Sequence, residues 1–197
     1  MPSGKIEMEK STLEKYLEEW YPGLQKETRT LSEVLSEMPG YKQNEIPFIV
    51  WLLENPKSPI AMPGYIDLFN HDCVHILLGR GLLAQDEAFV IGFTMGNSTS
   101  VNKFHNFIFK TFSLYFYPKN FKLLKRDLFA FDLGFKYGRN RKIRNINKMD
   151  FHHKSNLSIG EIRKELDITQ NDLIEMRKVE AQQIPHTKES ARLLIFD

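Results

Sequence analysis

Apolar residues recur at helical spacing over the first fifty positions of the chain. Between residues 10 and 20 they fall on one face, with charged residues opposite, which predicts an amphipathic helix. A second helix is predicted to begin after Thr30 and to end at Pro39, because Glu33 completes a capping-box pattern with Thr30. A third, apolar helix is predicted over residues 47 to 54, since proline is favoured in a first helical turn.

Two strongly apolar segments follow in the middle of the chain. Residues 65 to 78 are apolar almost throughout, and the Gly-Arg-Gly sequence at residues 79 to 81 ends the pattern. The next apolar run, residues 88 to 95, follows acidic residues and is ended by Gly-Asn-Ser at residues 96 to 98. We expect these two helices to form the interior of the protein.

The pattern stays helical beyond this point. Residues 101 to 117 carry more aromatic side chains than an average core helix, and a further apolar repeat follows Pro118. Ser158 and Glu161 form another capping-box pattern. The last part is polar, so residues 169 to 197 are expected to form a peripheral C-terminal segment.

These patterns predict an all-α fold, a single-domain helical bundle. No strand pattern supports a sheet, and 197 residues are the length of one ordinary domain. We divide the chain into an N-terminal amphipathic helix (1–29), a helical domain (30–168) and the peripheral segment (169–197).

Composition narrows the class of protein. The 27 basic residues nearly cancel the 25 acidic ones, so no global positive field favours nucleic acid as a partner. One cysteine cannot form an internal disulfide, and the first residues resemble neither a secretion signal nor an import peptide. The apolar runs are shorter than the ~20 residues of a spanning helix. We therefore expect a cytoplasmic protein that could lie on a membrane without crossing it.

Candidate metal ligands lie within the two most apolar helices. On a helix, His71 and His75 share a face, and Asp72 adjoins His75 three positions away. Glu87 follows after the glycine break, so an antiparallel helix hairpin could return its carboxylate to the same point. Two imidazoles and two carboxylates suit Zn²⁺, Fe²⁺ or Mn²⁺ better than Cu(I) or an iron–sulfur cluster.

Each of these residues also has a structural explanation. A histidine on a buried helix is commonly a hydrogen-bonded core residue, Asp72 could pair with Arg80, and Glu87 could favour a helix N-terminus. Together, however, they would place four polar groups in an apolar interior, where isolated charges cost several kcal/mol. The cluster therefore favours the metal site.

Three other features have structural interpretations. Cys73 should point away from His71 and pack as a buried thiol. Gly134 and Gly138 have the spacing of a close helix contact. The basic cluster at residues 139 to 144 is expected to be a solvated helix end, with anion binding as the alternative.

The spacing of His71, Asp72, His75 and Glu87 resembles the His-Asp-x-x-His-x11-Glu motif of the Coq-four family of ubiquinone-biosynthesis proteins. The likeness covers roughly residues 30 to 168. The surrounding segments that share it are Glu54-Asn55-Pro56-x-Ser58, Gly79-Arg80-Gly81, Asp86-Glu87-Ala88-Phe89, Phe131-x-x-Gly134-x-x-x-Gly138 and Glu161-Ile162-Arg163.

The resemblance implies an all-α fold with a buried metal-binding helix hairpin and an apolar pocket. The four motif residues would bind a divalent metal, zinc first and iron or manganese as alternatives. The ligand would be a prenylated quinone precursor or another isoprenoid lipid, with other quinone-biosynthesis proteins, the membrane surface and a second copy of the chain as further partners. Candidate pocket residues are aromatic: Phe104, Phe107, Phe112, Tyr115 and Phe116.

Two functions are compatible with these residues. The chain could be a metal-dependent catalyst that removes the ring carboxyl group of a prenylated aromatic acid and hydroxylates that carbon. It could instead be a non-catalytic lipid-binding scaffold with a structural metal. Two hydrolase classes fit less well, because HD phosphohydrolases need a histidine upstream of His71, and zinc peptidases use a longer Glu where this chain has Asp72.

Overall fold

The computed structural model describes residue 15 and residues 18–39, 66–115 and 123–193. Over these residues the fold is all-helical, as predicted, without a strand, and one isolated bridge joins Thr30 to Ser158. None of the described helices has the length and apolar character needed to cross a bilayer. The helices and 3-10 turns, in chain order, are α2 (Leu31–Ser36), α4 (Leu68–Leu78), α5 (Ala84–Asn97), α6 (Lys103–Tyr115), α7 (Asp127–Arg139), η2 (Ile146–Lys148), η3 (Phe151–Lys154), α8 (Ile159–Glu165), α9 (Gln170–Gln183) and α10 (Lys188–Leu193).

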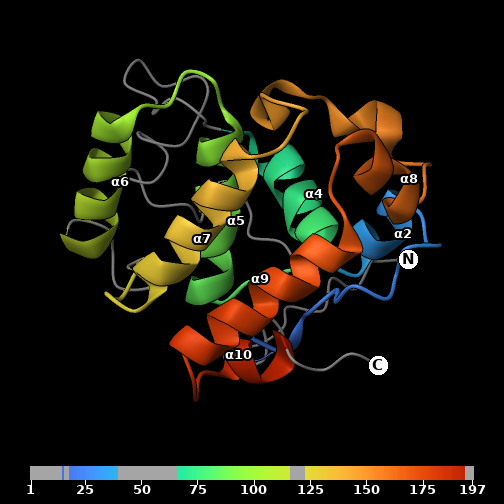
Figure 1. The fold of residues 1–197 in the computed structure, drawn as a ribbon. Helices are drawn as coiled ribbons and strands as arrows, with labels where there is room; N and C mark the ends of the chain where they lie inside the picture. Colours follow the sequence, from blue (N-terminus) through green and yellow to red (C-terminus); the bar gives the residue numbers. More distant parts are fainter. Residues whose placement is uncertain (1–14, 16–17, 40–65, 116–122, 194–197) are drawn as a thin grey trace, which may run out of the picture.

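Helices α5 and α7 lie side by side at the centre of the molecule, with α6 at one edge and α8 with α2 at the opposite edge (Figure 1). The predicted glycine contact is confirmed. A Cβ atom at Gly134 would lie 2.1 Å from the Phe89 carbonyl oxygen, and one at Gly138 would lie 2.2 Å from the Phe93 carbonyl oxygen. Gly92 and Gly96 of α5 lie equally close to the backbone of α7, so glycines on both helices let the two backbones touch.

Both predicted capping boxes are present. The Thr30 hydroxyl accepts a hydrogen bond from the Glu33 amide, and Glu33 accepts one from the Thr30 amide. Ser158 and Glu161 repeat this arrangement at the start of α8. Backbone hydrogen bonds between the two N-terminal ends, including Leu31 N–H to the Leu157 carbonyl at 3.0 Å, hold α2 beside α8.

The basic cluster at residues 139–144 is in part the expected solvated helix end, since Arg139 and Lys142 are exposed, but its other two basic residues bind backbone carbonyls. Arg144 donates to the carbonyls of Gly96 and Asn97, at 2.9 and 2.8 Å, and so caps the C-terminal end of α5. Arg141 donates to the Asp167 carbonyl at 2.7 Å. The density of basic residues along the sequence does not indicate that backbone carbonyls distant in sequence accept hydrogen bonds from these two guanidinium groups.

The C-terminal segment is also more deeply packed than expected for a peripheral one. Leu173 in α9 and Leu193 in α10 are buried, and Arg177 and Glu180 are at most 1% exposed. The reason is chemical, because the charged groups that α9 buries have partners in the turn after α4 and at the start of α5. Glu180 pairs with Arg80 and Gln85, and Arg177 donates to the Gly79 carbonyl, so the sequence of α9 looks like that of a solvated helix.

Some predictions lie outside the described residues. These are most of the N-terminal amphipathic helix over residues 1–29, the helix over residues 47–54, the Glu54-Asn55-Pro56 segment and Phe116.

Candidate metal centre

Helices α4 and α5 supply the candidate ligands. Asp67 caps α4 by accepting a hydrogen bond from the Asn70 amide at 3.1 Å, and His71 and His75 follow on one face. Gly79 ends the helix with φ of 63°, a left-handed conformation that favours glycine. The chain then turns back, and Glu87 lies in the first turn of α5.

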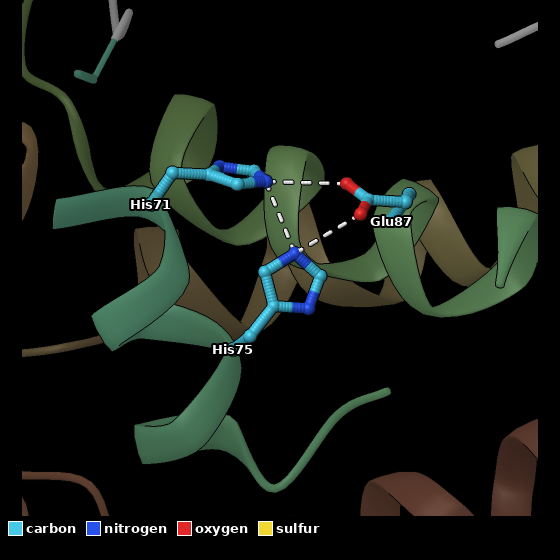
Figure 2. Close-up of side chains that lie close together, drawn as sticks. All are labelled: His71, His75 and Glu87. Carbon is cyan, nitrogen blue, oxygen red and sulfur yellow. Dashed lines mark hydrogen bonds and ion pairs between the residues drawn. The ribbon is translucent and has the colours of Figure 1, made fainter. Parts of the chain in front are cut away.

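Three of the four predicted ligands come together (Figure 2). His71 Nε2 lies 3.2 Å from Glu87 Oε2, and His75 Nε2 lies 3.3 Å from Glu87 Oε1. The two imidazole Nε2 atoms are 3.0 Å apart. One ligand atom from each side chain lies within 4.8 Å of the others, so the group can hold a metal ion.

A hydrogen bond to the backbone orients His75. Its Nδ1 lies 2.7 Å from the Gly81 carbonyl oxygen, which can only accept, so Nδ1 carries a proton. In the neutral imidazole, Nε2 then presents a lone pair toward Glu87 and His71. Metal-binding histidines commonly have this arrangement, with the second nitrogen held by a carbonyl or carboxylate.

The spacing of the three donors fits a small divalent ion. Converging lone pairs on His75 Nε2 and the Glu87 carboxylate repel unless a proton or a cation lies between them. A tetrahedral ion with bonds of about 2.0–2.1 Å places its ligand atoms about 3.3 Å apart. The observed separations of 3.0–3.3 Å therefore match a metal as well as a proton.

The cluster is partly exposed to solvent. The His75 side chain is fully buried, while the side chains of His71 and Glu87 are 17% and 31% exposed. Three protein ligands with access for solvent are typical of catalytic metal sites, in which water or substrate completes the coordination, whereas structural zinc sites usually have four protein ligands.

The histidines also set the charge of Glu87. In the metal-free protein, burial raises the pKa of its carboxyl, but the nearby charge of His75 in its protonated form, and the hydrogen bonds that protonated imidazoles donate, outweigh burial and hold the pKa well below its usual range. Glu87 is therefore an anion that can compensate a bound cation.

Asp72, the fourth predicted ligand, does not belong to this group in the part of the chain that the structure describes. It is partly buried on α4 beside the cluster, and burial raises its pKa to about 6, against the opposing charges of His71 and His75. The structure therefore brings together three of the four predicted ligands.

Replacing Asp72 by asparagine is expected to stabilise the metal-free protein at neutral pH. Because the folded-state pKa of about 6 exceeds the ordinary 3.8, the contribution of Asp72 to stability is complete below about pH 4 and is lost as the pH rises through 6. In the presence of chelator, Asp72→Asn should be more stable than wild-type protein by about 3 kcal/mol at pH 7.5 and by almost nothing at pH 4, as measured by urea denaturation. A lower stability of Asp72→Asn than of wild-type protein at pH 7.5 would contradict this expectation. If Asp72→Asn prepared without chelator failed to retain metal, Asp72 would be a metal ligand.

The predicted aromatic pocket residues lie mainly on the surface of α6. Phe104, Phe107 and Tyr115 are 62–67% exposed, while Phe112 is partly buried against the core. An exposed row of large aromatic side chains is unusual and commonly marks a contact surface.

Sequence reasoning missed the surroundings of the cluster. The Gly81 carbonyl was not foreseen as the partner of His75, nor was the burial of Asp86 beside Glu87. Backbone groups have no side-chain signal, and the partner of Asp86, Arg192, is more than a hundred residues away in sequence.

No protein-family model matches the chain, and no curated protein and no solved structure matches it either.

Proposed function

We propose that this chain binds one divalent metal ion through His71, His75 and Glu87 and acts on a prenylated aromatic acid of the ubiquinone-precursor type. The observation that carries the proposal is the cluster itself. The nearest ligand atoms of each pair of side chains are 3.0–3.3 Å apart, and one of the imidazoles has its other nitrogen held by the Gly81 carbonyl. The motif spacing that resembles the Coq-four family supports the substrate class.

The proposed reaction is decarboxylation of the ring. The bond between the ring carbon and the carboxyl carbon breaks, carbon dioxide leaves, and a proton takes its place on the ring. When bound, a divalent ion supplies Lewis acidity toward a carboxylate or phenolate oxygen. The protein's residues hold the donors in place: the Gly81 carbonyl fixes the ring of His75, and the Glu87 carboxylate is partly exposed to solvent. Hydroxylation of the same carbon would require an oxidant such as dioxygen.

The test combines metal analysis with a product assay. Purified protein should contain about one zinc, iron or manganese ion per chain by elemental analysis and should release labelled carbon dioxide from a carboxyl-labelled prenylated hydroxybenzoic acid. The His71→Ala/Glu87→Ala double variant should do neither. Wild-type protein without metal would refute the proposal, and metal without carbon dioxide release would remove its catalytic part.

A second candidate, a lipid-binding scaffold with a structural metal, is favoured by the exposed aromatic side chains of α6. Phe104, Phe107 and Tyr115 could contact an isoprenoid chain or the apolar layer of a membrane surface. The scaffold predicts lipid retention in native mass spectrometry without turnover of the labelled acid.

Metal saturation is expected to raise thermal stability. An ion that binds only the folded state adds about 2.7 kcal/mol at a free concentration one hundred times its Kd. For a chain of this length that raises the melting temperature by about 5–10 °C. The measurement is a thermal melt with Zn²⁺ or Mn²⁺ and then with excess chelator, which should reverse the gain; Mg²⁺, which prefers oxygen ligands, is the control.

A further inference from the structure

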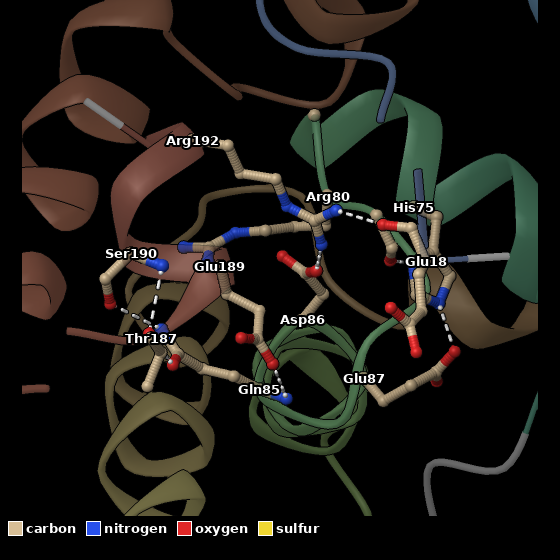
Figure 3. A network of polar contacts seen from close by, with 12 residues as sticks. Glu18, His75, Arg80, Gln85, Asp86, Glu87, Thr187, Glu189, Ser190 and Arg192 are labelled. Carbon is tan, nitrogen blue, oxygen red and sulfur yellow. Dashed lines mark hydrogen bonds and ion pairs between the residues drawn. The ribbon is translucent and has the colours of Figure 1, made fainter. Parts of the chain in front are cut away.

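The side chain of Arg192, in the last described helix, reaches the start of α5 (Figure 3). Its guanidinium forms an ion pair with Asp86, which is fully buried. Arg192 also donates to the Glu18 carbonyl at 3.2 Å and lies over the ring of Tyr21, 4.9 Å from its centroid. Three contacts thus hold this guanidinium.

The same guanidinium packs against Gly81. A Cβ atom at Gly81 would lie 2.6 Å from Arg192 Nη2 and 2.8 Å from the Trp20 carbonyl oxygen. The backbone at this residue is therefore confined between Arg192 and Trp20. Since the Gly81 carbonyl holds His75 Nδ1 at 2.7 Å, the position of Arg192 bears on the orientation of a candidate ligand.

The second contact of Arg192 bears on the other ligand-bearing helix. Asp86 immediately precedes Glu87, and in Figure 3 the two side chains leave the first turn of α5 in different directions, Asp86 toward Arg192 and Glu87 toward His75. Arg192 therefore touches both parts of the hairpin, the residue that orients His75 and the residue next to Glu87.

Neighbouring polar groups reinforce this arrangement. Arg80, between the two glycines of the hairpin, forms a two-pronged ion pair with Glu180 of α9, at 2.9 and 2.7 Å. Gln85 donates to Glu180 at 2.7 Å and accepts from Thr187 at 2.9 Å. The C-terminal helices thus bind the turn of the hairpin and the first turn of α5 together.

We propose that Arg192 is a positioning residue of the metal centre: by bracing Gly81 and Asp86 at once, it sets the distance between the imidazoles of α4 and the carboxylate of α5. This inference rests on the proposed metal-binding function. Groups that orient first ligands typically contribute about ten- to a hundredfold to metal affinity, and Arg192 acts through such a group.

The experiment compares Arg192→Gln with wild-type protein, using Co²⁺ as the probe. We expect Arg192→Gln to bind Co²⁺ about tenfold more weakly in competition with a chromophoric chelator and to change the visible absorption that reports coordination. Arg192→Lys, which keeps the charge but loses the planar fork, should give an intermediate affinity and serves if Arg192→Gln does not fold. The matched control is Arg144→Gln, which removes a guanidinium that caps the far end of α5.

Each outcome decides a different point. An unchanged affinity and absorption in Arg192→Gln would overturn the positioning role, as would an equal loss in Arg144→Gln, because general destabilisation would then explain both. If wild-type protein binds no Co²⁺, the proposed function fails. The NMR signal of the His75 Nδ1 proton still tests the brace in metal-free protein: its loss in Arg192→Gln supports the positioning role, and its retention refutes it.

Discussion

Replacing His75 by alanine is expected to leave the protein without bound metal. The imidazole supplies one of three donors, and its loss leaves only His71 and Glu87, whose closest atoms are 3.2 Å apart. Because disrupting a group behind a ligand already costs about ten- to a hundredfold in affinity, removal of the ligand itself should cost more than a hundredfold. The metal content after dialysis, measured by elemental analysis, should be about one ion per chain in wild-type protein and none in His75→Ala.

The metal-free variant should also lose stability. His75 is fully buried, and its removal leaves the Gly81 carbonyl without that partner, which costs about 1–3 kcal/mol. The control is His153→Ala, whose side chain is 86% exposed and which should keep metal and stability. Retention of metal by His75→Ala would place the ion elsewhere and refute the assigned centre.

Local signals in the sequence predicted much of the fold. The two capping boxes and the left-handed Gly79 depend on residues a few positions apart, so short patterns suffice to locate these helix ends. The spacing of Gly134 and Gly138 likewise predicted a close helix contact. These features have in common that one residue type satisfies a backbone requirement that few others can.

The packing of the C-terminal helices could not be predicted in this way. Arg80 and Glu180 are a hundred residues apart, and each alone looks like a solvated charge. A helix that buries ion pairs lacks the apolar stripe by which a core helix is recognised. Such pairing depends on tertiary arrangement and appears only once the helices are placed.

The candidate site falls between these cases. Helical spacing placed His71 and His75 on one face, and the glycine break allowed Glu87 to return to them, as the structure shows. The same spacing put Asp72 beside His75, but neighbours along a helix face need not point to the same centre, and Asp72 stays outside the group of ligand atoms. The spacing of residues along the helix does not specify the direction in which the Asp72 side chain points.

The contact between α5 and α7 matters for the site because α5 carries Glu87. Gly134 of α7 lies against the backbone of Phe89, two residues beyond Glu87. A Cβ atom there would meet the carbonyl oxygen of Phe89 at 2.1 Å, a backbone atom that cannot rotate away as a side chain can. Any residue larger than glycine must therefore push the two helices apart.

Gly134→Ala is accordingly expected to destabilise the protein by about 3 kcal/mol, the upper end of the cost of overpacking, and to lower the melting temperature by about 10 °C. Its higher helix propensity offsets only about 1 kcal/mol. Urea denaturation should show the loss, and metal affinity should fall because α5 shifts. The matched control is Gly160→Ala, where the nearest atom, the Glu27 carbonyl oxygen, would be 3.2 Å away and a small adjustment suffices. Equal stabilities of the two variants would mean that α5 and α7 do not touch at Gly134, and that α7 does not hold Glu87 in place.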